Sequence, residues 1–289
     1  MAFSLAEFIG AKDTEPTEVK KIMNKAKKIL EDGKIDEATK LYNQALQQAI
    51  AANDVDHVND IKQQLGMIAF ALEKYSDAEK LLFEVKDHLL SKKKTDTLRL
   101  SYVLLRLAES YQFLNDFNKA EQYYNECADN LKMKIDDALK KKDLETIEFW
   151  LMFLASEAHY YLMRGVFDKA QKYFKRAYEI SVETKGEISE HTVTFLQQLG
   201  AVAFQNGDLE VAVEYLKQAT DSGKHLPGMV SLSNVYVSLG NIYLKQGLLK
   251  DAEVMCNQAF KNAKRHQYTK GIDDANACLK EVQEAIQST

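Results

Sequence analysis

Apolar residues recur every three or four positions along most of the chain, the spacing that places them on one face of an α-helix. A longer pattern is superimposed: a small residue, Ala twelve positions later, an apolar residue four further on and a small or apolar one three after that. It occurs six times, at Ala26/Ala38/Tyr42/Ala45, Gly66/Ala78/Leu82/Val85, Ala108/Ala120/Tyr124/Cys127, Ala158/Ala170/Phe174/Ala177, Gly200/Ala212/Leu216/Ala219 and Gly240/Ala252/Cys256/Ala259. Small side chains let two helices approach closely, so the pattern predicts six stacked helix pairs.

Turn residues separate the two helices of most pairs. Glycine after a helix supplies the positive φ that ends it, and the predicted turns are Asp32-Gly33-Lys34, Asn115-Asp116, Arg164-Gly165, Asn206-Gly207-Asp208 and Gln246-Gly247. We place the six pairs near residues 19–52, 59–92, 101–134, 151–184, 193–226 and 233–266. A further apolar stripe predicts a capping helix at 272–286. Residues 19–287 then form one repeat domain, and residues 1–18, which lack the pattern, are expected to be mobile.

The spacing between pairs is uneven. The leading small residues stand at 26, 66, 108, 158, 200 and 240, so the steps are 40, 42, 50, 42 and 40 residues. Helix-pair repeats of the shortest common type are about 34 residues long. We therefore expect longer helices or connections throughout, with extra material at 133–147. That segment (residues 131–147) or the N-terminal tail is a candidate to cover part of the chain's own binding surface.

Composition narrows the class. The chain is 46% hydrophobic and 28% charged, with two prolines, Pro16 and Pro227, in 289 residues. Strong helix formers fill the interval between them, which indicates an all-α protein. A net charge of −5 argues against binding of nucleic acid, whose phosphates require a basic face. The runs 92–94 and 140–142, each three lysines, read as solvated helix ends, with contact to acidic lipid or a partner as the alternative.

The sequence shows no motif for catalysis, cofactor binding or metal binding. Six scattered histidines form no H-E-x-x-H, and there is no G-x-G-x-x-G or P-loop, so we expect a non-enzyme without a cofactor. Cys127, Cys256 and Cys278 fall on apolar faces and are interpreted as small buried thiols, not as disulfide or metal partners. The longest apolar run, 149–155, is too short to cross a bilayer. The N-terminus reads as neither a secretory signal nor a transit peptide.

The positions that a repeat turns toward its concave groove are the candidate partner-binding residues. In this register they lie three before, one after and four after the leading small residue, and the resulting surface is mostly apolar or neutral. The candidates are Met67, Phe70, Leu105, Gln112, His159, Phe204, Val237, Asn241 and Leu244, and the register also includes Gln63 and Glu109. An apolar groove suits an amphipathic or extended partner segment. The aromatic residues Tyr42, Tyr111, Tyr124, Trp150, Tyr161, Phe174 and Tyr243 are instead expected in the core.

This arrangement resembles the tetratricopeptide-repeat superfamily over about residues 19–265, which implies a right-handed superhelical solenoid of six extended helix pairs plus the capping helix. The lysine, asparagine and arginine clamp of chaperone-docking members is missing: the first repeat has Met23 and Lys27, and the second has Gln64. No enzyme chemistry follows from the superfamily. The resemblance therefore implies a protein-binding function without a bound C-terminal carboxylate.

Three stretches narrow the resemblance further. These are KIMNKAKKILEDGKIDEATKLYNQALQQAI, CADNLKMKIDDALKKKDLETIEF, and SLGNIYLKQGLLKDAEVMCNQAFKNAKRH followed by ANACLKEVQEAI. They are similar to the family of tetratricopeptide repeat protein 19, mitochondrial proteins associated with respiratory complex III. The resemblance implies association with the mitochondrial inner membrane, assembly and upkeep of complex III, and turnover of fragments of its Rieske subunit; a link to cytokinesis has also been proposed for the family. Family members carry a presequence that this chain does not show, so the alternative is a cytoplasmic adaptor of kinesin-light-chain type.

Overall fold

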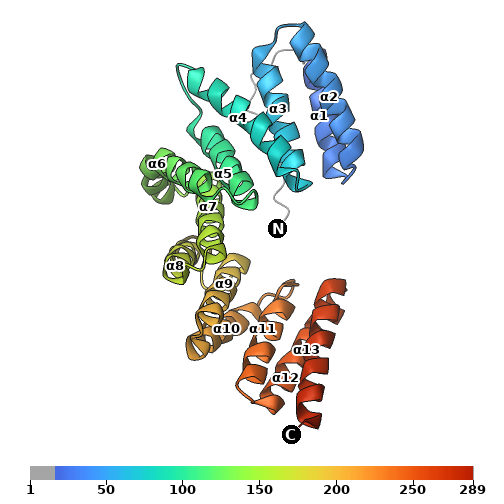
Figure 1. Cartoon of the computed structure of the whole chain (residues 1–289), viewed down its shortest axis with the longest axis vertical. Helices are drawn as coiled ribbons and strands as arrows, with labels where there is room; N and C mark the ends of the chain where they lie inside the picture. Colours follow the sequence, from blue (N-terminus) through green and yellow to red (C-terminus); the bar gives the residue numbers. More distant parts are fainter. Residues whose placement is uncertain (1–16, 289) are drawn as a thin grey trace. The chain divides into compact units, whose positions relative to one another are not determined.

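The computed structural model describes residues 17–288, and the regular elements of that range are thirteen α-helices (Figure 1). They pair in chain order, and the last helix stands alone. Their bounds are α1 (Glu18–Glu31), α2 (Ile35–Ala51), α3 (Val55–Ala71), α4 (Tyr75–Ser91), α5 (Thr97–Phe113), α6 (Phe117–Lys141), α7 (Leu144–Met163), α8 (Phe167–Lys185), α9 (Glu190–Asn206), α10 (Leu209–Gly223), α11 (Leu232–Lys245), α12 (Leu249–Arg265) and α13 (Thr269–Gln287).

The chain divides into two compact units. Unit 1 covers residues 1–137 and unit 2 covers residues 138–289, so the boundary falls within α6. Within each unit every helix packs chiefly on its neighbours in the chain, for example α3 on α4 and α9 on α10. The predicted fold class, an all-α stack of helix pairs with a final capping helix, is confirmed over the described residues.

Local signals account for the helix ends. The side chains of Asp54, Asp96 and Ser189 accept hydrogen bonds from the N–H groups of the third helical residues of α3, α5 and α9, which satisfies donors that a helix leaves unpaired at its start. At the predicted glycine turns, Gly33 and Gly207 have φ of 78° and 92°. The remaining turns place other residues in this left-handed region, among them Glu73, Asn115 and Lys142.

The small residues of the repeat lie where helices are closest. The alanines of the pattern, such as Ala26, Ala108 and Ala170, have no exposed surface. A Cβ added to Gly200 would lie 2.7 Å from Cγ of Leu216, and one added to Gly66 would lie 2.9 Å from Cγ of Leu82. Both distances are shorter than a normal carbon contact, so the close approach requires glycine at these positions.

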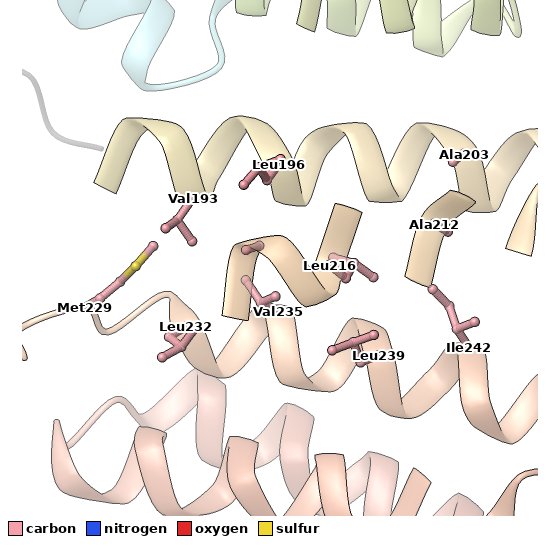
Figure 2. Packing of buried hydrophobic residues seen from close by; sticks show 11 residues of the cluster. Val193, Leu196, Ala203, Ala212, Leu216, Met229, Leu232, Val235, Leu239 and Ile242 are labelled. Atoms are coloured by element: carbon pink, nitrogen blue, oxygen red, sulfur yellow. The ribbon is translucent and has the colours of Figure 1, made fainter. Parts of the chain in front are cut away.

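Buried apolar side chains fill the space between successive pairs. In unit 2, one core cluster joins α9, α10 and α11, and Figure 2 shows its side chains converging between these helices. In unit 1 a corresponding cluster joins α1, α2 and α3 around Met23, Tyr42 and Ile61. A single pair could not bury both of its faces, so each pair depends on the next for stability.

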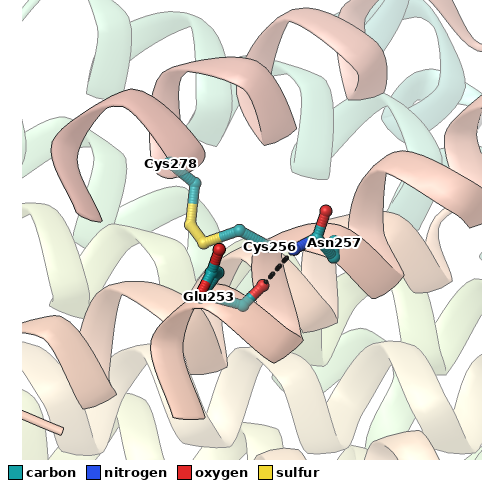
Figure 3. Close-up of a disulfide and its surroundings, with 4 residues drawn as sticks. All are labelled: Glu253, Cys256, Asn257 and Cys278. Carbon is teal, nitrogen blue, oxygen red and sulfur yellow. Dashed lines mark hydrogen bonds between the residues drawn. A yellow bond between two sulfur atoms is a disulfide. The ribbon is translucent and has the colours of Figure 1, made fainter. Parts of the chain in front are cut away.

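The capping helix brings together two cysteines that the sequence separates by 22 residues. Cys256 of α12 and Cys278 of α13 form a disulfide, with Cα atoms 5.8 Å apart (Figure 3). The prediction of three buried thiols is therefore wrong for this pair. The reason is that both residues lie on apolar helix faces, and those faces meet where Gly240 of α11 leaves room for the sulfurs. The prediction is confirmed for Cys127, whose buried thiol donates to the Ser101 carbonyl at 3.3 Å.

The longest repeat step is explained by helix length. The extra residues lengthen α6 to 25 residues and α7 to 20 residues. Both lysine runs lie at helix ends, since α4 ends at Ser91 and α6 ends at Lys141. The prediction for residues 1–18 falls mostly outside the described residues; Thr17 caps α1, which begins at Glu18. Among the described helices, none is long and apolar enough to span a membrane.

Candidate partner-binding surface

An aromatic cluster on unit 1 combines the predicted groove residue Phe70 with Tyr75 and Phe113. Phe70, near the end of α3, contacts Tyr75 of α4, with ring centroids 5.4 Å apart, and Phe113 at the end of α5, at 6.1 Å. Tyr75 and Phe113 stack at 4.6 Å. Phe70 is half-buried, and Phe113 keeps 44% of its surface exposed. Rings that are held in place but still accessible are typical anchors for a partner side chain.

A cation lies against this cluster. The guanidinium of Arg106 lies 5.2 Å from the ring centroid of Phe70 and 5.2 Å from that of Tyr102. Its Nη1 contacts Glu109 Oε2 at 2.5 Å. Burial would lower the pKa of Arg106, but the Glu109 carboxylate and Tyr102 outweigh it and raise that pKa above its ordinary value. Arg106 therefore stays charged and makes cation–π contacts with Phe70 and Tyr102, which help to hold these rings in place.

The other predicted positions of unit 1 are not accessible. Leu105 is fully buried, and Met67 and Gln112 retain 5% and 4% of their surface. Gln112 accepts a hydrogen bond from Tyr124 Oη at 2.7 Å. In this structure a partner cannot contact these three side chains, so their assignment to the groove is corrected: they pack inside the repeat. Gln63 is likewise occupied, because Arg99 Nε donates to it at 2.7 Å.

Unit 2 presents its predicted residues differently. Phe204 of α9 is half-buried, with Lys245 Nζ of α11 4.9 Å from its ring centroid. Asn241 of α11 is exposed. His159 of α7 is also exposed and makes an edge contact with Phe174, at 5.1 Å between centroids. Phe204, Lys245 and Asn241 thus offer a ring, a cation and an amide from neighbouring inner helices.

The capping helix α13 covers part of the predicted groove surface of α11. Val237 and Leu244 of α11 are half-buried and pack against the cluster that contains Cys256, Cys278 and Val282. These two predicted residues therefore face the chain's own C-terminal helices. The segments expected from the sequence to cover this surface were residues 131–147 or the N-terminal tail, and α13 was not among them.

Repeats three (α5 and α6) and four (α7 and α8) each contain a stacked pair of tyrosines that joins their two helices. Tyr111 stacks on Tyr123 at 5.5 Å, and Tyr161 stacks on Tyr173 at 5.6 Å. Lys119 and Lys169 lie over Tyr111 and Tyr161 respectively. The core assignment is confirmed for Tyr42, Tyr111, Tyr124, Tyr161 and Phe174, which are buried, whereas Trp150 and Tyr243 are half-buried.

A half-buried ion-pair cluster joins α7, α8 and α9. Glu148 lies 2.6 Å from Lys185 Nζ and 3.0 Å from His191 Nε2. The His191 side chain and then Lys185 lower the pKa of Glu148 to about 2, against the opposing effect of burial. Its three members are held by one another, so the cluster joins helices and offers no substrate site. In the described residues no group of His, Cys, Asp and Glu is arranged to hold a metal.

Sequence reasoning missed Phe113, Arg106 and Lys245. Each lies one residue beyond a position of the assumed register: Leu105 precedes Arg106, Gln112 precedes Phe113, and Leu244 precedes Lys245. The available signal was an aromatic or basic residue directly after a predicted groove position on an inner helix.

Family models for the tetratricopeptide repeat match residues 154–224, 101–129 and 233–266. Among curated proteins, the chain is 23% identical over 289 residues to the mitochondrial tetratricopeptide repeat protein 19 homolog of Drosophila melanogaster, a match that covers 99% of this chain and 78% of the fly protein. It is 27% identical to mitochondrial tetratricopeptide repeat protein 19 of Danio rerio, covering 78% and 59% of the two chains. For the Homo sapiens protein the identity is 23%, covering 88% and 69%.

Solved structures agree on the fold. The apo form of RapI matches with a TM-score of 0.66 at 11% identity, covering 94% of this chain and 98% of RapI. Aspartyl phosphate phosphatase F from Bacillus subtilis also matches at 0.66, with 13% identity and coverage of 97% and 84%. At such identities the likeness concerns the stacked helix pairs alone.

Proposed function

We propose that this chain, a tetratricopeptide-repeat protein that works by binding other proteins, is a mitochondrial factor for the assembly and integrity of respiratory complex III. In this role it associates with the inner membrane, binds complex III subunits including the Rieske protein, and promotes the turnover of Rieske fragments. It catalyses no reaction itself. The observation that carries the proposal is the collinear similarity to the fly protein over 99% of this chain.

The geometry supports a particular mode of binding. Phe70, Tyr75 and Phe113 form an aromatic platform beside Arg106 on unit 1. On unit 2, Phe204 lies beside Lys245. Both surfaces combine rings with a cation, which suits a partner segment that carries apolar side chains together with acidic groups or backbone carbonyls. We therefore place the main anchor of the partner segment at Phe70 and Phe113.

The test is affinity capture from solubilised mitochondria of the source organism, with co-purifying proteins identified by mass spectrometry. The tagged parent is compared with a Phe70→Ser/Phe113→Ser variant and with a control, Val254→Ser, whose side chain is exposed on α12. The expected result is enrichment of complex III subunits or Rieske fragments by the parent and the control, and at least about tenfold less by the aromatic variant.

One outcome would contradict the proposed function, and another would contradict only the proposed binding surface. If complex III subunits are absent and cytosolic partners are captured from whole-cell extract, the chain is a cytoplasmic adaptor. If complex III subunits are captured equally by the aromatic variant, with unchanged circular dichroism, the function stands but the binding surface lies elsewhere.

A further inference from the structure

The sixth repeat has a cysteine where other repeats have a large side chain. The third position of the repeat pattern is Leu82 in the second repeat and Leu216 in the fifth, and each lies against the leading glycine of its repeat. In the sixth repeat this position is Cys256, which is bonded to Cys278 of α13 (Figure 3). A Cβ added to Gly240 would lie 2.7 Å and 2.8 Å from the two sulfurs. The disulfide thus takes the place of a large apolar side chain.

The rest of the interface that holds α13 is small. The other buried residues of this helix are Gly271, Ala275 and Val282, and Leu279 is half-buried. Such side chains bury little apolar surface, and burial stabilises in proportion to the surface removed from water. The N-cap residue Tyr268 makes no side-chain hydrogen bond to the start of the helix. The disulfide is therefore a large part of what holds α13 on α11 and α12.

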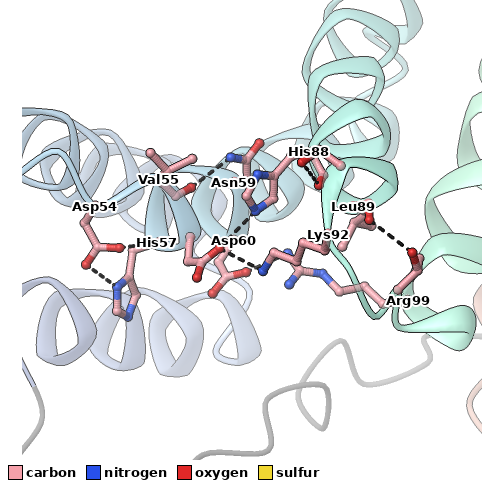
Figure 4. A network of polar contacts seen from close by, with 12 residues as sticks. Asp54, Val55, His57, Asn59, Asp60, His88, Leu89, Lys92 and Arg99 are labelled. Carbon is pink, nitrogen blue, oxygen red and sulfur yellow. Dashed lines mark hydrogen bonds and ion pairs between the residues drawn. The ribbon is translucent and has the colours of Figure 1, made fainter.

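Ion pairs join neighbouring helices in other repeats. Arg99 of α5 lies 2.6 Å from Asp60 of α3 (Figure 4), and the Glu148 cluster joins α7, α8 and α9. On α13 the ion pair Lys280–Glu284 is exposed and lies within the helix, so it does not join α13 to its neighbours. At the end of the stack a covalent bond takes the part that these ion pairs play elsewhere.

Breaking the bond leaves two thiols in a space that is shaped for a bonded pair. Sulfur atoms that are not bonded must separate to a van der Waals distance, and a packed interior resists such an increase in volume. Gly240 closes the space on the side of α11, and the Ala252 carbonyl oxygen of α12 would lie 3.5 Å from the same added Cβ. The thiols can therefore separate only if α13 moves away.

We propose that the Cys256–Cys278 disulfide is a redox switch: the bond keeps α13 seated, and its reduction releases α13 and uncovers Val237 and Leu244 of α11. These two predicted groove residues pack against the cluster that contains both cysteines and Val282. The oxidised chain thus keeps part of its last inner surface covered. The inference goes beyond the proposed function and does not depend on it.

The reductant of this switch is a dithiol. One of its thiolates attacks a sulfur of the bridge and forms a mixed disulfide, and its second thiol then displaces the protein thiolate. The dithiol becomes a disulfide, and its two electrons and two protons end on the thiols of Cys256 and Cys278. Since these residues are 0% and 2% exposed, the attack requires α13 to open first. The oxidised state is therefore kept until α13 opens.

Hydrogen exchange measured by mass spectrometry tests the release of α13 in the full chain, before and after reduction with dithiothreitol. Amides of α13 should exchange about 100-fold faster after reduction, because the bond that restricts the open state is lost. Amides of α9 and α10 should keep their rates, which shows that the rest of unit 2 stays folded. The variant Cys278→Ala should exchange rapidly in α13 with or without dithiothreitol.

The third cysteine provides an internal control for accessibility. Cys127 is a buried thiol on α6 that takes no part in the bond. In the reduced chain a maleimide should modify Cys256 and Cys278 at least about tenfold faster than Cys127, because buried thiols react only after local opening. Hydroxyl-radical labelling of Leu244 should rise on reduction, whereas that of the fully buried Leu105 should not.

Equal exchange of α13 in the oxidised and reduced chains, with the two thiols as slow to react as Cys127, would overturn the proposal. Faster exchange throughout unit 2 would also overturn it, because the bond would then stabilise the whole unit and not seat one helix. So would a chain purified in air in which mass spectrometry finds no disulfide. None of these readouts involves capture of complex III subunits, so the switch and the proposed function can fail separately.

Discussion

The inner helices α5 and α11 occupy equivalent places in their repeats, but they use the predicted groove positions in different ways. On α5 all three positions are closed: Leu105 is fully buried, Glu109 pairs with Arg106, and Gln112 accepts from Tyr124. On α11, Asn241 is exposed and Val237 and Leu244 are half-buried. The same register therefore gives an interior on one helix and a partly open surface on the other.

The difference lies in which side chains the neighbours provide. On α5 the polar groove residues find partners inside the repeat, because Tyr124 of α6 and Arg106 of α5 itself reach them. On α11 the apolar residues Val237 and Leu244 pack against a cluster that includes Cys278 and Val282 of α13. The repeat register predicts the position of a side chain on its helix. Whether that side chain is accessible depends on the residues that pack against it.

The largest effect that tests this comparison is expected at Leu105. Replacement Leu105→Ala should lower the free energy of unfolding by about 3 kcal/mol, because it removes a fully buried side chain and leaves a cavity. Leu244→Ala should cost about 1 kcal/mol, since that side chain is half in solvent. Urea unfolding followed by circular dichroism measures both. Equal losses would mean that α5 and α11 are not distinguished by burial.

The disulfide tests whether the cap stabilises unit 2 separately. Reduction of Cys256–Cys278 opens a loop of 22 residues and should lower the stability of unit 2 by about 3 kcal/mol through the freedom gained by the unfolded chain. Trp150, the one tryptophan of the chain, lies on α7 and reports on unit 2 by its fluorescence. The urea midpoint of that signal should fall when the oxidised protein is reduced.

Mass spectrometry of the unfolded protein under non-reducing conditions provides the control, since it shows whether the bond is present before reduction. A tryptophan transition that does not move when the bond is lost would show that the packing of α13 on α11 and α12, and not the cross-link, holds the cap.

The sequence was sufficient to predict the helix pairs but not the accessibility of the groove. Small residues such as Ala108 and Gly200 are constrained by backbone approach, and that constraint repeats visibly along the chain. Accessibility depends on single contacts between distant residues, such as Arg99 with Gln63, which follow no period. The pairing of Cys256 with Cys278 escaped prediction for the same reason, because the two faces meet only after α13 has packed.

The Glu148 ion-pair cluster makes the stability of unit 2 depend on pH. The pKa of Glu148 is lowered from 4.5 to about 2, so its ionised form stabilises unit 2 above pH 4.5, and this contribution is lost as the pH falls from 4.5 toward 2. At pH 7 Glu148→Gln should cost about 2 kcal/mol, the usual value of a hydrogen bond to a charged group. The gap between parent and variant should close below pH 4.5.

Trp150 fluorescence during urea unfolding measures this gap, since Trp150 and Glu148 lie on the same helix. The matched control is Glu183→Gln, an exposed carboxylate on α8, which should behave as the parent at every pH. A parent–variant gap that stays constant between pH 7 and pH 3 would contradict the assigned role of Glu148.

The smallest effect on stability and the sharpest effect on binding should occur at the same residue, Phe113. Because 44% of its surface is exposed, Phe113→Ser should change the free energy of unfolding by less than about 1 kcal/mol. Capture of the partner should nevertheless fall about tenfold, since the ring completes the platform with Phe70 and Tyr75. Leu244→Ser should reduce capture less, because that side chain already packs against the α12–α13 cluster. If Leu244→Ser abolishes capture and Phe113→Ser does not, the partner binds the inner surface of unit 2, and contact with α13 leaves enough of α11 open to serve as the anchor.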